Sequence, residues 1–159
     1  MSFLAEAMKH TKNRNKINNI IIICAAVSSK KQMKMLIPKF GTSSMSGLAS
    51  DSINPKAGNI PKSSLSYNCI QVNTITLDSL IEKSKIDQND IALIKIDVER
   101  MEADVLMSGK STLLKGHPPI LFEANSLELL FETKKVLDEL GYNHYEKISE
   151  RDYIAKKKS

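Results

Sequence analysis

The 159-residue sequence has few of the residues on which common metal and redox sites depend. Its two cysteines, Cys24 and Cys69, form no CxxC or Cys/His spacing, so no zinc or other metal site with cysteine or histidine ligands is expected. Both lie in apolar runs, which is typical of buried, reduced thiols in a reducing compartment. The longest apolar run, residues 20–27, is far shorter than the roughly 20 residues that span a bilayer. With no apolar segment behind a basic start, we expect no signal peptide and no membrane association, and therefore a cytoplasmic protein.

Arginine is also scarce. The net charge is +5, yet only Arg14, Arg100 and Arg151 contribute guanidinium groups, and lysine supplies the rest of the positive charge. Recognition of bases and phosphates favours the planar fork of arginine. We therefore expect a solvated lysine surface and no nucleic-acid partner.

The six glycines never fall two positions apart, so the sequence contains neither GxGxxG nor GxxxxGK[ST]. These motifs let the backbone approach a bound nucleotide or phosphate closely. A loop of that kind is excluded for this sequence.

The N-terminal half predicts a helix, a buried strand and a hairpin. Residues 2–16 have helical spacing, and residues 20–27 form a continuous apolar run typical of a parallel strand buried on both faces. Residues 33–38 and 69–77 alternate as two strands that we expect to pair. Residues 40–66, rich in Gly, Ser, Asn and Pro, are expected to form a flap or loop insertion.

The C-terminal half alternates strands and helices. Asp78 is expected to cap a short helix, Asn125 or Ser126 to cap a later one, and Gly141 to end it. The other predicted elements are strands at residues 91–98, 120–124, 142–148 and 152–156 and a helix at residues 100–114. This order predicts a single α/β domain with a mostly parallel sheet covered by helices.

Three acidic residues lie at the carboxyl ends of predicted strands: Asp97, Glu99 and Glu123. Ligands of open α/β sheets bind beyond the carboxyl ends of the strands. If the strands before Asp97 and Glu123 are neighbours, their carboxylates could act together as a cation site or as a general base. The alternative is that Asp97 or Glu99 merely complements the N-terminus of the next helix.

The residues also resemble a known family. The segment IALIKIDVERME, residues 91–102, is similar to the signature of FkbM-type methyltransferases, IDLIKIDVEGAE. In the family's order, VNTITLDSL (72–80) resembles its TLDSL segment, PILFE (119–123) its PIILFE, residues 19–28 its NVxLxNxAVSD, and FGTSSMS (40–46) its serine-rich loop.

The resemblance implies a Rossmann-like class I sheet and methyl transfer from S-adenosylmethionine, usually to a hydroxyl of a sugar or natural product. Position by position, it implies catalytic roles for Asp97 and Glu99. Cofactor contacts would come from Ala26, Ser28 and Asp97, and acceptor contacts from Ser43, Ser44, Glu102 and Glu123.

Two departures from the family bear on activity. The family's first two strands and glycine-rich loop have no counterpart here, so we expect an incomplete, N-terminally truncated sheet within residues 1–159. Arg100 replaces the glycine of the DVEG motif, which would be strained if this position needs a positive φ. The domain is therefore expected to be a methyltransferase domain, which could be inactive in this truncated form. The alternative is a non-catalytic remnant that binds a partner chain completing the sheet.

Overall fold

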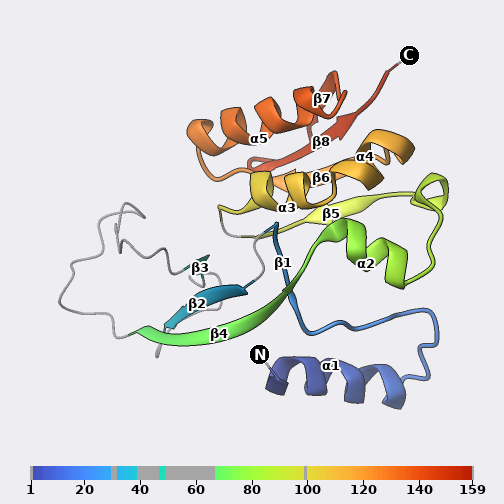
Figure 1. The fold of residues 1–159 in the computed structure, drawn as a ribbon, viewed down its shortest axis with the longest axis vertical. Helices are drawn as coiled ribbons and strands as arrows, with labels where there is room; N and C mark the ends of the chain where they lie inside the picture. The colour runs from blue at the N-terminus through green and yellow to red at the C-terminus, as the bar shows by residue number, and fades with distance from the viewer. Residues whose placement is uncertain (1, 30–31, 39–46, 49–66, 99, 159) are drawn as a thin grey trace.

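The computed structural model describes residues 2–29, 32–38, 47–48, 67–98 and 100–158 (Figure 1). Its strands form two four-stranded sheets, in the orders β1-β4-β2-β3 and β5-β6-β8-β7. The α/β class expected from the sequence is confirmed. The expectation of one mostly parallel sheet is wrong for the described residues, because each sheet contains one parallel pair and is otherwise antiparallel.

The first sheet contains the predicted hairpin. β2 (Gln32–Pro38) pairs antiparallel with β4 (Tyr67–Ile75), and the two-residue β3 (Gly47–Leu48) extends the sheet beside β2. On the other side of β4 lies β1 (Ala26–Val27), which is parallel to it. Apart from Gly47 and Leu48, the predicted flap at residues 40–66 lies outside the described residues.

The apolar run at residues 20–27 forms much less strand than predicted. Only Ala26 and Val27 pair with a neighbouring strand, whereas residues 20–24 have no regular structure. Ile21 is 76% exposed, and Ile20 and Ile23 are also exposed. No strand in the described ranges pairs with residues 20–23, so the buried strand that their sequence predicts is not formed there.

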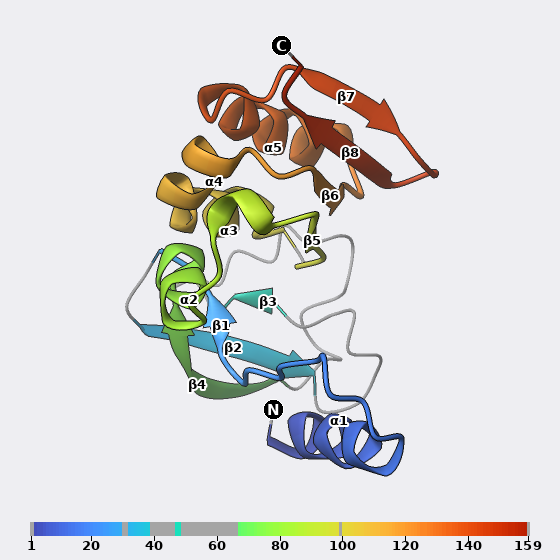
Figure 2. The same ribbon diagram turned by 90° about the vertical axis from the view of Figure 1, so that its right-hand side faces the viewer.

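The second sheet carries the largest hydrophobic core. β5 (Ile94–Ile96) is parallel to β6 (Ile120–Glu123), which pairs antiparallel with β8 (Asp152–Lys156), and β8 pairs antiparallel with β7 (His144–Lys147). Figure 2 shows α3 (Glu102–Ser108), α4 (Lys110–Gly116) and α5 (Leu127–Glu139) gathered on one side of this sheet. Fully buried side chains from the strands and these helices form its core: Leu106, Leu113, Ile120, Phe122, Leu137 and Ala155.

The predicted helix at residues 100–114 is two helices, α3 and α4, separated at Gly109. A Cβ atom at Gly109 would lie 2.5 Å from Cδ2 of Leu77, the first residue of α2 (Leu77–Lys83). Helix α2 therefore packs closely against the break, and a side chain at Gly109 would displace it.

Asp78 has a different role from the one expected. The N-cap of α2 is Thr76, whose hydroxyl accepts from the Ser79 N–H. The Asp78 carboxylate instead accepts from the backbone N–H groups of Ser111 and Thr112, at 3.1 and 2.8 Å. Gly109, the N-cap residue of α4, has no side chain to do this, so a residue of α2 caps α4 from outside.

Several local predictions are confirmed. Ser126 is the N-cap of α5 and accepts from the Leu129 N–H, and Gly141 follows this helix with φ +84°. The helix predicted at residues 2–16 is α1 (Ser2–Arg14), and a short 3₁₀ helix (Gln88–Asp90) precedes β5. None of the helices in the described part of the chain is long and apolar enough to cross a membrane.

Candidate functional site

The predicted meeting of two strand ends occurs. Ile96 of β5 is paired with Phe122 of β6, so Asp97, which follows β5, and Glu123, the last residue of β6, lie at the same end of neighbouring parallel strands. Glu123 is in turn paired with Asp152 of β8. Three carboxylates therefore lie at one edge of the second sheet, at the place where ligands of α/β sheets bind.

Lys95 lies among these carboxylates. Its Nζ is 2.9 Å from Oδ2 of Asp97, and both side chains are more than half exposed. The hydrogen bond and the charge of Asp97 raise the pKa of Lys95, and Asp152 and Glu123 add smaller contributions in the same direction. Because the pair is solvated, it orients Asp97 more than it stabilises the fold.

Ser28, predicted to contact the cofactor, is fixed by the protein itself. It is 1% exposed, and its N–H bonds the carbonyl of Ile75 at 3.1 Å, beyond the two residues that β1 pairs with β4. Its hydroxyl donates to Oδ2 of Asp104 at 2.5 Å, and the Ser29 hydroxyl donates to Oδ1 of the same carboxylate. Ala26 lies half-buried in β1, two residues before Ser28.

Sequence reasoning missed Asp104, which lies in the first turn of α3. An acidic residue in the first turn is favoured by the positive end of the helix dipole. The presence of Asp104 there therefore does not indicate that it also binds a serine. Its contact with Ser28 spans 76 residues and joins the end of β1 to a helix of the second sheet.

The remaining predicted residues are only partly placed. Glu102 lies in the first turn of α3 and is 5% exposed, and Glu123 is half-buried. Glu99, Ser43 and Ser44 lie outside the described residues. The structure thus brings Asp97 and Glu123 together, while Ser28 is hydrogen-bonded to α3.

Arg100 adopts φ 65°, so the position at which the family signature has glycine does need a left-handed backbone here. This region is disfavoured for residues that carry a Cβ. Arg100 is exposed and follows the strand-end segment that contains Asp97. The conditional expectation of strain at this residue is confirmed.

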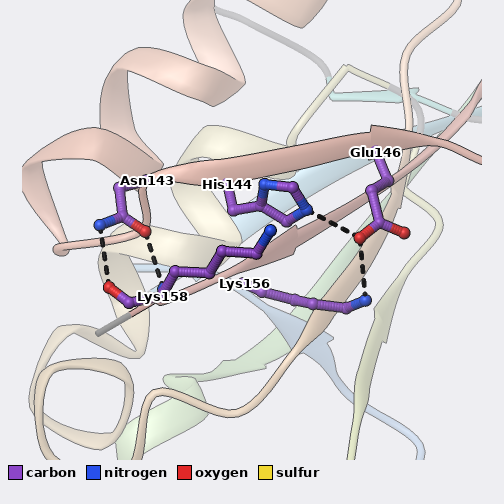
Figure 3. A network of polar contacts seen from close by, with 5 residues as sticks. All are labelled: Asn143, His144, Glu146, Lys156 and Lys158. Carbon is purple, nitrogen blue, oxygen red and sulfur yellow. Dashed lines mark hydrogen bonds and ion pairs between the residues drawn. The ribbon is translucent and has the colours of Figure 1, made fainter.

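A second polar network lies on β7 and β8 (Figure 3). Glu146 accepts from His144 at 2.8 Å and from Lys156 at 3.2 Å, which lowers its pKa, with the His144 hydrogen bond as the largest cause. Beside it, Asn143 and Lys158 exchange two hydrogen bonds. The network joins the two final strands at an exposed edge. Among the described residues, no three His, Cys, Asp or Glu side chains are placed to hold a metal ion.

Comparison with known families places this arrangement in context. The family model described as the methyltransferase FkbM domain matches residues 4–154. Comparisons with curated proteins and with solved structures give no significant match. Because the family match spans nearly the whole chain, this protein belongs to the FkbM methyltransferase family.

Proposed function

We propose that this chain is an S-adenosylmethionine-dependent O-methyltransferase that acts on a hydroxyl group of a sugar or natural product. The family match over residues 4–154 carries the proposal. When bound, S-adenosylmethionine supplies an electrophilic methyl group. The residues at the carboxyl edge of β5 and β6 then have to bind the acceptor hydroxyl and remove its proton.

Asp97 is the proposed general base. A hydroxyl oxygen becomes more nucleophilic as its proton is taken up, so a carboxylate within hydrogen-bond reach lowers the barrier. The Asp97 side chain is 57% exposed and can therefore reach an acceptor from solution. Lys95 holds one of its oxygens at 2.9 Å, which leaves the other to accept the hydroxyl proton. Glu99 remains a second candidate from the sequence.

The acidic edge fits part of the proposed cofactor. S-adenosylmethionine carries ribose hydroxyls and an ammonium group, both of which donate to carboxylates such as Asp97. Ser28 already donates its hydroxyl to Asp104, so its proposed contribution, with that of Ala26, is to shape the wall of the site through the backbone. Glu102 and Glu123, with Ser43 and Ser44, are proposed for the acceptor side.

Calorimetric titration of the purified chain with S-adenosylhomocysteine tests the proposal. We expect one-to-one binding, weakened in Asp97→Asn and unchanged in Glu150→Gln, an exposed carboxylate between β7 and β8. With labelled S-adenosylmethionine and a panel of sugars and hydroxylated natural products, Asp97→Asn should lower methyl transfer by roughly 10²–10⁴-fold, the usual contribution of a general base. A folded chain that binds no S-adenosylhomocysteine would contradict the proposal.

One observation favours a second candidate, a non-catalytic binding module. The exposed isoleucines of residues 20–23 lie outside any strand, and β5 is an edge strand with β6 as its one neighbour in the described ranges. These are features of an interaction surface. If the chain binds no S-adenosylhomocysteine but forms a stable complex with a partner chain, the binding-module function is favoured over the methyltransferase function.

A further inference from the structure

In the described ranges no strand pairs with the outer edge of β5, so that edge can accept a further strand. Ile94 donates its N–H to the carbonyl of Pro119, which begins the β6 ladder. Since backbone groups alternate along a strand, Lys95 points its N–H and C=O away from β6, toward the open edge. Edge groups of this kind are a template for strand addition.

The same chain carries a segment with the composition of a strand that lies outside both sheets. Residues 20–23, here called the isoleucine run, have the sequence IIII and no regular structure. Ile20, Ile21 and Ile23 expose 43%, 76% and 47% of their surface. Runs of β-branched residues favour strands, and exposing several together is costly in water. The chain thus contains both an apolar segment that favours a strand, the isoleucine run, and a strand edge that can accept it, that of β5.

The charges around the two elements are opposite. The residues before the isoleucine run include Lys12, Arg14 and Lys16, against a single acid in the first 29 residues, Glu6. The carboxyl end of β5 has Asp97, Glu123 and Asp152 near Lys95, and residues 97–104 hold four acids against one cation, Arg100. Complementary charges of this kind steer association and fix its orientation.

We propose that a second copy of this chain adds its isoleucine run antiparallel to β5, completing the sheet edge. Antiparallel addition places the basic end of the run, before Ile20, beside the acidic end of β5 at Asp97. With Ile22 opposite Lys95, Ile21 and Ile23 fall on the face of Ile94 and Ile96, which the helices cover. The residue after the run, Cys24, then lies opposite Leu93. A shift by one residue would place Ile20 and Ile22 on the covered face instead, and would leave Ile21, the most exposed of the run at 76%, on the polar face. Burial of the Ile21 side chain therefore favours the first register.

A two-fold dimer satisfies both edges at once, because each copy gives its run and receives the other's. The partner's run would end beside Asp97, so the second copy would form one wall of the candidate site. The dimer itself does not depend on methyltransferase activity, and its test requires neither cofactor nor acceptor.

Disulfide trapping tests the register in the full chain. Leu93 is 50% exposed, and directly opposed residues of antiparallel strands lie within the Cα separation that a disulfide requires. Leu93→Cys should give a covalent dimer through the native Cys24 under mild oxidation. Leu93→Cys combined with Cys24→Ser should give none, and neither should Ile86→Cys, an exposed control position with Cys24 retained. Cys69 is present in every variant. An intrachain bond between Cys24 and the thiol introduced at position 93, or equal dimer yield in the controls, would overturn the proposal.

Sedimentation equilibrium tests the contact without cross-linking. We expect the unmodified chain to dimerise with increasing concentration, and the dimer to weaken at least tenfold in Ile21→Lys and in Lys95→Pro. Proline at residue 95 removes an N–H that faces the edge, so pairing with β6 is retained. Phe131→Lys changes an exposed apolar residue of α5 and should leave the dimer unchanged. A chain that stays monomeric throughout, or a dimer indifferent to both variants, refutes the contact, whatever the outcome of the S-adenosylhomocysteine titration.

Discussion

The hydroxyl of Ser28 donates a 2.5 Å hydrogen bond to the carboxylate of Asp104, and this contact joins the two sheets. Ser28 follows β1 and is bound to the first sheet through the carbonyl of Ile75, while Asp104 lies in α3, which packs on the second sheet. The link is polar and enclosed, with Ser28 only 1% exposed. It therefore fixes how the end of β1 lies relative to the strand ends of the candidate site.

The first prediction concerns this link. Ser28→Ala should lower the free energy of unfolding by about 1.5–3 kcal/mol, the usual value of a hydrogen bond to a charged group. Ser29→Ala removes a hydroxyl that donates to the same carboxylate from an exposed position, so its effect should be smaller. Urea denaturation of both variants measures the difference. Equal effects would show that burial of Ser28 adds nothing to the link.

Arg100 provides the second prediction. Its φ of 65° costs about 1–2 kcal/mol for a residue with a Cβ, and glycine avoids this cost. Arg100→Gly should therefore stabilise the chain by up to about 1 kcal/mol once the greater freedom of glycine in the unfolded state is subtracted. The matched control is Lys135→Gly in the middle of α5, which should destabilise by about 1 kcal/mol. If Arg100→Gly destabilises instead, the guanidinium makes contacts that outweigh the backbone strain.

The third prediction is a pH dependence. Burial lowers the pKa of His117 below its ordinary value of 6.5, and the charge of Lys157 lowers it further. The unfolded chain therefore takes up this proton at a higher pH than the folded chain does. The stability contributed by neutral His117 is complete above pH 6.5 and is lost as the pH falls from there through the pKa of the folded state.

Histidine NMR in the folded protein and in urea measures the two pKa values of His117 directly. His117→Asn is the matched variant, because asparagine also tolerates the left-handed backbone of this residue, whose φ is 43°. The variant should flatten the dependence of unfolding free energy on pH just below 6.5. A higher titration midpoint in the folded chain than in the unfolded one would reverse the sign and contradict the prediction.

The fourth prediction concerns Gly116 at the end of α4. A Cβ atom there would lie 2.4 Å from the carbonyl oxygen of Gln88, which is backbone and cannot rotate away. Gly116→Ala should therefore destabilise the chain by about 1–3 kcal/mol through overpacking, despite the higher helix propensity of alanine. Lys115→Ala, at an exposed neighbouring position, should change stability little. Thermal unfolding of the two variants separates them.

Elements with a local signal could be predicted from the sequence. Ser126 caps its own helix, Gly141 adopts the positive φ that ends it, and the alternation of residues 69–77 indicates a strand. In each case the residues that determine the structure lie within a few positions of one another. The last strand, Asp152–Lys156, has the predicted bounds for the same reason.

Features that depend on a distant residue could not be predicted. Asp78 has the composition and place of an N-cap, yet it caps a helix more than 30 residues away because Gly109 leaves that helix without a cap. The split between α3 and α4 likewise depends on the approach of Leu77 to Gly109. The isoleucines at 20–23 indicate a buried strand, but a sequence pattern shows only that a segment needs covering and not which strand covers it.

The candidate site shows the same division. The order of strands and acids predicted that Asp97 and Glu123 could approach each other if their strands were neighbours, and β5 and β6 are adjacent and parallel. The hydrogen bond between Ser28 and Asp104 could not be predicted, because neither a serine after a strand nor an aspartate in the first turn of a helix indicates a distant partner. Resemblance to a family assigns a role to each position, whereas the hydrogen-bond partner of each hydroxyl depends on how the elements pack in the folded chain.

The division of the strands into two sheets has a consequence for how the molecule opens. The main core cluster is formed by β5, β6 and β8 with α3, α4 and α5, and from the first sheet Val27 packs against it. The two sheets should therefore behave as separate cooperative units in native-state hydrogen exchange. Amides of β6 should exchange only through complete unfolding, while those of β2 and β4 should exchange through a partial opening that leaves the cluster intact. Breaking the Ser28–Asp104 bond should accelerate both classes by the same factor, because the bond is lost in the partial opening as well as in complete unfolding.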